Sequence, residues 1–152
     1  MGTVIVMGFF AVVFAYLAQF SHFRHGLKIS FFMIFLFAAF RYDYGNDYKA
    51  YYNLFQDLKN NGVNYIINDQ RFHSHFEVGW IYFNYLFLPF GFFAMVAFLA
   101  IFNCLIYYKI IKEFVPKNYY WLAIFLYVFS PYIMLVQLSA MRQSLAISLF
   151  LL

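Results

Sequence analysis

Long apolar runs separated by short polar connectors dominate the chain. They cover residues 3–19, 27–40, 92–108 and 119–138, and a fifth begins at 144. A helix needs about 20 apolar residues to cross the hydrocarbon core of a bilayer. The runs are too long and too uniformly apolar for the strands of a membrane barrel, which alternate apolar and polar positions. The pattern predicts an all-α integral membrane protein, a multispanning bundle of about four to five transmembrane helices.

Breaks within the apolar sequence refine this prediction. The uncharged stretch from Trp80 to Tyr108 is interrupted by residues 89–91, Pro-Phe-Gly, so we expect an interfacial helix to about Leu88 and a span from Phe92. Pro131 predicts a bend in the fourth span. The fifth run stops after about half a bilayer, which indicates a single helical membrane domain, residues 1–152, truncated at its C-terminus.

One long polar segment, residues 41–79, separates the second and third apolar runs. Within it, residues 47–60 have helical spacing, with an apolar face made of Tyr48, Tyr51, Tyr52, Phe55 and Leu58. The sequence Asn-Asn-Gly at 60–62 is a helix stop signal. Residues 74–77, Ser-His-Phe-Glu, match a capping box and predict a new helix from about His75. We therefore expect an amphipathic helix lying on the membrane or on the other spans.

Composition agrees with a lipid environment. The chain is 66% hydrophobic and 11% charged, whereas soluble domains are about 45–50% apolar and about a quarter charged. The net charge of +4 is spread out, and no run of Lys and Arg has the density of a nucleic-acid-binding surface. The one cysteine, Cys104, cannot form a disulfide within the chain.

The distribution of basic residues predicts topology. Arg24 and Lys28 lie in the first short connector, and Lys109, Lys112 and Lys117 flank the second. Short cytoplasmic loops carry an excess of Lys and Arg, so both connectors should be cytoplasmic. The segment 41–79 and the turn around position 142 then face the other side. Ionic residues far apart in sequence would then share one extracytoplasmic face of a multi-pass membrane protein.

Two arginines on that face are candidate anion-binding groups. Arg41 follows the second apolar run directly, and Arg142 interrupts apolar sequence where the positive-inside rule does not require a cation. A guanidinium group matches phosphate oxygens bidentately, so the two could hold a pyrophosphate. The alternatives are a snorkelling membrane anchor for Arg41 and a solvated turn for Arg142.

Three carboxylates are candidates for proton transfer from a hydroxyl group, or for hydrogen bonding to one. Asp43 lies between aromatic residues. Asp47 could instead be the N-cap of the helix that starts at Tyr48. Glu77 could instead complete the capping box.

Aromatic residues and histidines complete the candidate chemistry. Tyr48 and Trp80 could stack on sugar rings, or could be membrane-belt or packing residues. His73 and His75, two positions apart in a loop, have weak spacing for zinc, and we predict no metal site and no cofactor.

Three short motifs resemble those of the EpsG family, Wzy-like polymerases of bacterial exopolysaccharide, capsule and O-antigen synthesis. Residues 41–51 match the pattern R-x-x-x-G-x-D-Y-x-x-Y. Glu77, Gly79 and Trp80 match E-x-G-aromatic, and residues 142–146 match R-Q-x-[LF]-A. Family members are roughly twice this length or more, so the chain resembles their N-terminal part.

The resemblance implies a membrane glycosyltransferase that polymerises oligosaccharide repeat units carried on undecaprenyl pyrophosphate, at the outer face of the cytoplasmic membrane. Arg41 and Arg142 would hold pyrophosphate, and Asp43, Asp47 or Glu77 would handle the acceptor hydroxyl. The implied partners are the lipid-linked oligosaccharide, the bilayer and other polysaccharide-assembly membrane proteins. Two alternatives stay open: a flippase or transporter of the lipid-linked glycan, and a non-catalytic assembly protein of the same pathway.

Overall fold

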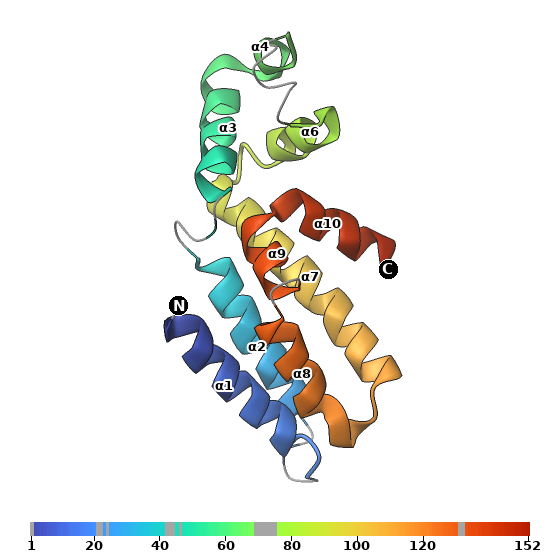
Figure 1. The fold of residues 1–152 in the computed structure, drawn as a ribbon. Coiled ribbons are helices and arrows are strands. Elements are labelled where there is room, and N and C mark those ends of the chain that lie inside the picture. Colours follow the sequence, from blue (N-terminus) through green and yellow to red (C-terminus); the bar gives the residue numbers. More distant parts are fainter. Residues whose placement is uncertain are drawn as a thin grey trace.

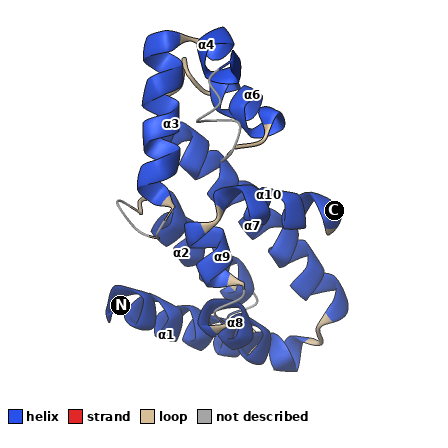
Figure 2. Ribbon diagram, turned by 45° about the horizontal axis from the view of Figure 1, so that its top comes forward, coloured by secondary structure: helices blue, strands red, loops and turns tan. Residues whose placement is uncertain are grey.

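The computed structural model describes residues 2–20, 23, 25–41, 45, 47–68, 76–130 and 133–152. Every regular element in these ranges is helical (Figure 2). They are α1 (Gly2–Leu17), α2 (Gly26–Ala39), α3 (Tyr48–Asn61), α4 (Val63–Asn68), α6 (Val78–Leu86), α7 (Phe92–Phe114), the 3-10 helix η2 (Lys117–Tyr119), α8 (Tyr120–Phe129), α9 (Met134–Ser139) and α10 (Met141–Phe150). The all-helical prediction is confirmed.

Helix α7 is the central element of the molecule. It runs from beside α3 to the opposite end of the bundle and takes part in two hydrophobic cores (Figure 1). Phe92, Met95 and Val96 in its first half pack with α3, α4 and α6. Ala100 and Cys104 further along pack with α1, α2, α8 and α9. One continuous helix therefore joins the two groups of helices.

Small residues allow α1 and α2 to approach closely. Gly8, Ala11 and Ala15 are the buried positions of α1. A Cβ atom at Gly26 of α2 would lie 2.2 Å from the backbone oxygen of Phe14. The buried hydroxyl of Ser30 donates to the carbonyl of Ala11 at 2.7 Å. Small residues and interhelical hydrogen bonds are typical of packing between membrane helices, because lipid provides little hydrophobic drive.

Membrane-spanning length is met by one helix within the described ranges. Helix α7 has 23 residues of high hydropathy, whereas the apolar helices α1 and α2 are shorter. At a rise of 1.5 Å per residue, the 16 residues of α1 give about 24 Å, below the roughly 30 Å of a hydrocarbon core. Four to five spans are therefore not confirmed, and the predicted fourth span is divided into α8 and α9. Pro131, the predicted bend, lies outside the described residues.

The predicted break before α7 and the amphipathic helix are both confirmed. Helix α6 ends at Leu86, and Gly91, with φ of +89°, precedes α7. Helix α3 buries Tyr48, Tyr51, Leu54, Phe55 and Leu58 and ends at Gly62, with φ of +80°. Tyr52, which the pattern placed on the buried face, is exposed, and Leu54 takes its place. The buried face packs against protein, since α3 shares a core with α4, α6 and α7.

The polar segment and the basic connectors lie at opposite ends of the bundle. In Figure 1 the α1–α2 and α7–α8 connections are at the bottom, while α3, α4 and α6 are at the top and α10 crosses the upper part of α7. The bottom end contains the start of α2 with Lys28, the end of α7 with Lys109 and Lys112, and η2 with Lys117. The upper part contains the end of α2, which Arg41 follows, α3 with Lys49 and Lys59, the start of α6, which Glu77 precedes, and α10 with Arg142.

Candidate functional site

An ion pair between α10 and the start of α6 is the centre of the candidate site. The Nη1 atom of Arg142 lies 2.5 Å from the Oε2 atom of Glu77, across 65 positions of sequence. Arg142 also lies over the ring of Phe76, 5.3 Å from its centroid. Two of the three sequence motifs therefore meet in one contact.

Helix ends place both charges. Glu77 has extended backbone angles and is the residue before α6, which begins at Val78. Glu77 is therefore at the N-cap position of α6 rather than in its first turn, it makes no side-chain cap bond, and its carboxylate contacts Arg142. Ser74, the other half of the predicted capping box, lies outside the described residues. Arg142 is the second residue of α10, directly after the break at Ala140 between α9 and α10.

The environment favours the charged form of both partners. The pKa of Glu77 is lowered, first by a hydrogen bond from its own backbone N–H and then by the hydrogen bond from Arg142. Burial alone would lower the pKa of Arg142, but hydrogen bonds and charge interactions with Tyr51 and Glu77 outweigh it, and the pKa is raised. Both side chains therefore carry charge at neutral pH.

A groove of about 380 Å³ opens beside this ion pair. Glu77 and Arg142 line its polar part, and the remainder is formed mainly by apolar residues of α6 and α10: Trp80, Phe83, Leu145 and Leu149. The carboxylate of Glu77 is open to the surroundings, since its side chain is 74% exposed. The groove therefore combines a charged mouth with an apolar wall, a combination that suits an amphiphilic ligand.

Arg41 has a different environment from the one predicted. It is 7% exposed, and its Nη1 atom donates to the carbonyl of Gln137 at 2.7 Å. That carbonyl lies near the end of α9, where backbone oxygens lack partners within the helix. Burial lowers the pKa of Arg41 to about 10, although Tyr48 and Tyr51 oppose the shift. The snorkelling alternative for Arg41 is wrong, because the guanidinium turns into the protein.

The first motif packs against the residues that precede the third. Gly45 has φ of +97°, and a Cβ atom there would lie 2.8 Å from the Cα atom of Ser139. Both its backbone angle and this close approach require glycine. Arg41 and Gly45 thus both contact the end of α9, three to five residues before Arg142.

The other predicted residues take different positions. Asp47 is exposed at the N-cap position of α3, and its side chain makes no cap bond. Tyr48 is buried against Phe92 with its ring edge-on at 5.5 Å. Trp80 is buried and stacks on Phe83 while lining the groove. Asp43, His73 and His75 lie outside the described residues. Within the described ranges, no cluster of metal-ligating side chains is present.

Tyr51, which the sequence places on the apolar face of its helix, has polar contacts that the pattern does not predict. It is 2% exposed, its ring packs edge-on against Trp80 at 5.4 Å, and its side chain hydrogen-bonds to Arg142. It also interacts electrostatically with Arg41. Tyr51 therefore lies between the two candidate arginines. Its position as the last residue of the first motif was the available signal.

Comparison with known proteins identifies the family. Residues 27–152 match the sequence model of the EpsG family, which covers most of the chain and includes all three motifs. No curated protein and no solved structure matches the chain. The chain therefore belongs to the EpsG family, which assigns it to the membrane proteins of polysaccharide biosynthesis.

Proposed function

We propose that this protein is a polysaccharide polymerase that joins lipid-linked oligosaccharide units at the outer face of the bacterial cytoplasmic membrane. The observation that carries the proposal is the Arg142–Glu77 ion pair at the mouth of an apolar groove. A lipid pyrophosphate has the matching chemistry: an isoprenoid chain for the groove wall and a dianionic headgroup for a guanidinium. Family membership supports the pathway.

The reaction requires one nucleophile, one leaving group and one proton acceptor. The hydroxyl oxygen of the acceptor sugar attacks the anomeric carbon of the donor sugar, and the bond from that carbon to the pyrophosphate oxygen breaks. The products are the lengthened lipid-linked glycan and undecaprenyl pyrophosphate. A carboxylate takes the hydroxyl proton, and a cation offsets the charge that develops on the leaving group.

In this proposal Arg142 holds the pyrophosphate and Glu77 takes the proton. The lowered pKa of Glu77 makes it a weak base while Arg142 is its partner. When pyrophosphate binds Arg142, the guanidinium is shared or withdrawn, and the pKa of Glu77 rises toward the range in which it accepts a proton more effectively. Asp43 and Asp47, the two carboxylates of the first motif, are the other candidate bases. Tyr51 positions Arg142.

Substitutions at the ion pair test the proposal in cells that make the polysaccharide. We expect Arg142→Ala and Glu77→Gln each to reduce polymer formation at least 100-fold, the usual loss on removing one transition-state charge partner. Arg142→Lys should restore little of the polymer formation, because an ammonium group lacks the bidentate geometry of a guanidinium group. Lipid-linked glycans are separated by length on gels, and protein in the membrane is measured by immunoblot.

The matched control is Lys59→Ala, which removes an exposed cation from the end of α3, away from the groove. It should leave polymer length unchanged. The proposal is wrong if Arg142→Ala and Glu77→Gln leave long polymer intact. Accumulation of single repeat units on the cytoplasmic side would instead identify a flippase, whereas the polymerase predicts that they accumulate outside.

A further inference from the structure

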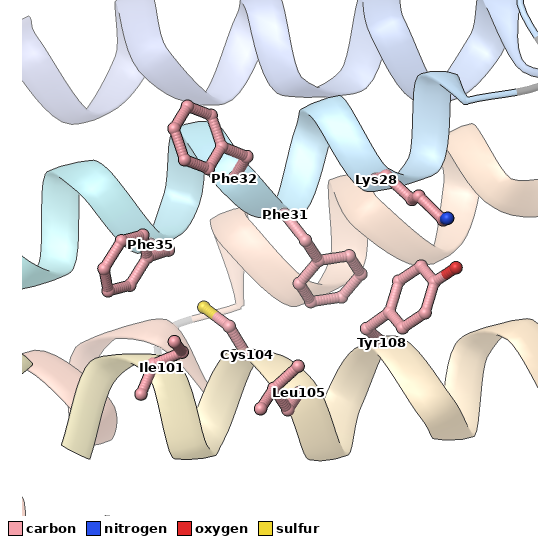
Figure 3. Close-up of a pocket in the computed structure, with 8 residues that line it drawn as sticks. All are labelled: Lys28, Phe31, Phe32, Phe35, Ile101, Cys104, Leu105 and Tyr108. Atoms are coloured by element: carbon pink, nitrogen blue, oxygen red, sulfur yellow. The ribbon is translucent and has the colours of Figure 1, made fainter. Parts of the chain in front are cut away.

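A second groove lies between α2 and α7, at the end of the bundle opposite the candidate site. Its volume is about 380 Å³, and Figure 3 shows side chains of the two helices facing one another across it. Its walls are apolar: Phe31, Phe32 and Phe35 from α2, and Ile101, Cys104 and Leu105 from α7. None of these residues belongs to the proposed polymerase site.

The groove opens away from the protein core. Phe32 is 58% exposed and Leu105 is 60% exposed, and α7 is long and apolar enough to cross a membrane. In a bilayer these surfaces contact hydrocarbon, and a recess of this volume leaves its wall without close contacts unless a chain fills it. The occupant must therefore be apolar along most of its length.

One end of the groove is polar and basic. Lys28 and Tyr108 line it there, and Figure 3 shows the amine of Lys28 close to the hydroxyl of Tyr108. The ring of Tyr108 is held edge-on by Phe31 at 5.7 Å and lies 5.8 Å from the amine of Lys112. Helix α2 contains no acidic residue, and within the described residues no carboxylate pairs with Lys28. The polar end therefore matches an anion.

The length of the groove fits one acyl chain. Lys28 to Phe35 on α2, and Ile101 to Tyr108 on α7, each cover eight residues, or about 10 Å of helix from the first Cα atom to the last. One leaflet of hydrocarbon is about 15 Å deep. A chain that starts at the basic end would therefore run along the groove for about two thirds of its leaflet. An extended peptide segment would instead bring unpaired backbone polar groups into an apolar wall.

We propose that this groove binds a phospholipid with an anionic headgroup. One acyl chain lies between α2 and α7, and the phosphate accepts hydrogen bonds from the amine of Lys28 and the hydroxyl of Tyr108. Basic residues at membrane ends attract anionic lipids, and the basic end here carries Lys28, Lys109, Lys112 and Lys117. The bound lipid belongs to the leaflet at that end, so the site is separate from any lipid-linked substrate at the candidate site.

Photo-crosslinking in vesicles tests the proposal. The protein is reconstituted in phosphatidylcholine with a trace of phosphatidylglycerol that carries a diazirine in its acyl chain. We expect crosslinks on both walls of the groove, around Phe32 and Leu105. Lys28→Ala should lower them about fivefold, since one cation near the surface supplies this much preference for an anionic lipid. Leu105→Trp, which fills the groove, should remove them.

Lys117→Ala is the matched control. It removes an exposed cation from the same end that does not line the groove, so it should change crosslinking less than twofold. Three results would overturn the proposal: equal crosslinking by a phosphatidylcholine probe, equal losses in Lys28→Ala and Lys117→Ala, or crosslinks between two protein chains at the groove in place of lipid. The readout does not depend on polymer formation.

Discussion

Arg41 joins two distant segments of the chain through one buried hydrogen bond. Its donation to the carbonyl of Gln137 satisfies a backbone oxygen near the end of α9, and Gln137 in turn accepts a hydrogen bond from the hydroxyl of Tyr127 at 2.6 Å. Its guanidinium therefore has a structural role in this conformation. A hydrogen bond to a charged group contributes about 1.5–3 kcal/mol.

We predict that Arg41→Ala lowers the free energy of unfolding by about 2 kcal/mol, because the carbonyl of Gln137 loses its partner. Arg41→Met keeps the apolar stem but removes the same hydrogen bond, so it should lower the free energy of unfolding by a similar amount. Thermal unfolding of the protein in detergent measures both. If both variants unfold at the wild-type temperature and lose only polymer formation, Arg41 binds substrate rather than holding α9.

The candidate site shows which residues the sequence could identify. Arg142 was recognisable because a cation interrupts apolar sequence, and Glu77 because it opens a helix. Their pairing could not be predicted, since it depends on how α10 crosses the molecule. Helical spacing places Tyr51 on the buried face of α3, but it cannot show that the hydroxyl of Tyr51 reaches Arg142.

At the level of elements, a buried polar network fixes α10 on α7. The amide of Asn103 donates to the hydroxyl of Ser144 at 2.6 Å, and the hydroxyl of Ser148 donates to the amide oxygen of Asn103 at 2.5 Å. Ser144 and Ser148 are four residues apart and therefore face the same way on α10. Because Arg142 is on α10, this network also sets where the candidate cation lies.

We predict that Asn103→Ala destabilises the protein by about 1 kcal/mol, from two interhelical hydrogen bonds worth about 0.6 kcal/mol each. Ser144→Ala with Ser148→Ala should cost a similar amount, and the triple variant little more, since all three remove the same contacts. Ile101→Ala, an exposed truncation on the same helix, is the control. If the triple variant loses as much stability as Asn103→Ala and the double serine variant together, the three residues do not form one network.

Element boundaries could be predicted where the sequence carries local signals. Gly62 and Gly91 mark the end of α3 and the start of α7, and both have a positive φ, which glycine adopts more readily than other residues. For residues 119–138 the sequence predicts only a bent helix, whereas the structure divides this stretch into α8 and α9. The sequence predicts a new run from residue 144 after a turn around Arg142, whereas α10 begins at Met141 and includes Arg142, because Ala140 carries no sequence signal for this earlier start.

At the level of the whole molecule, α7 carries basic residues near one end and reaches the candidate site with the other. Its first half packs under α3 and α6, and its last turns carry Lys109 and Lys112 beside the α7–α8 connection (Figure 1). The connector lysines Lys28, Lys109, Lys112 and Lys117 therefore lie at the end opposite the candidate site, and this separation is what the positive-inside rule predicts if that end is cytoplasmic. The proposed function depends on this separation, because it places the joining of lipid-linked units on the outer side of the membrane.

Labelling with a membrane-impermeant maleimide tests this arrangement most directly. In a Cys104→Ala background, single cysteines replace Asn61, Gln143 and Lys117, all exposed positions. We predict that Asn61→Cys and Gln143→Cys react in intact cells from outside, and that Lys117→Cys reacts only after permeabilisation. Labelling of positions 61 and 143 from opposite sides of the membrane would contradict the account.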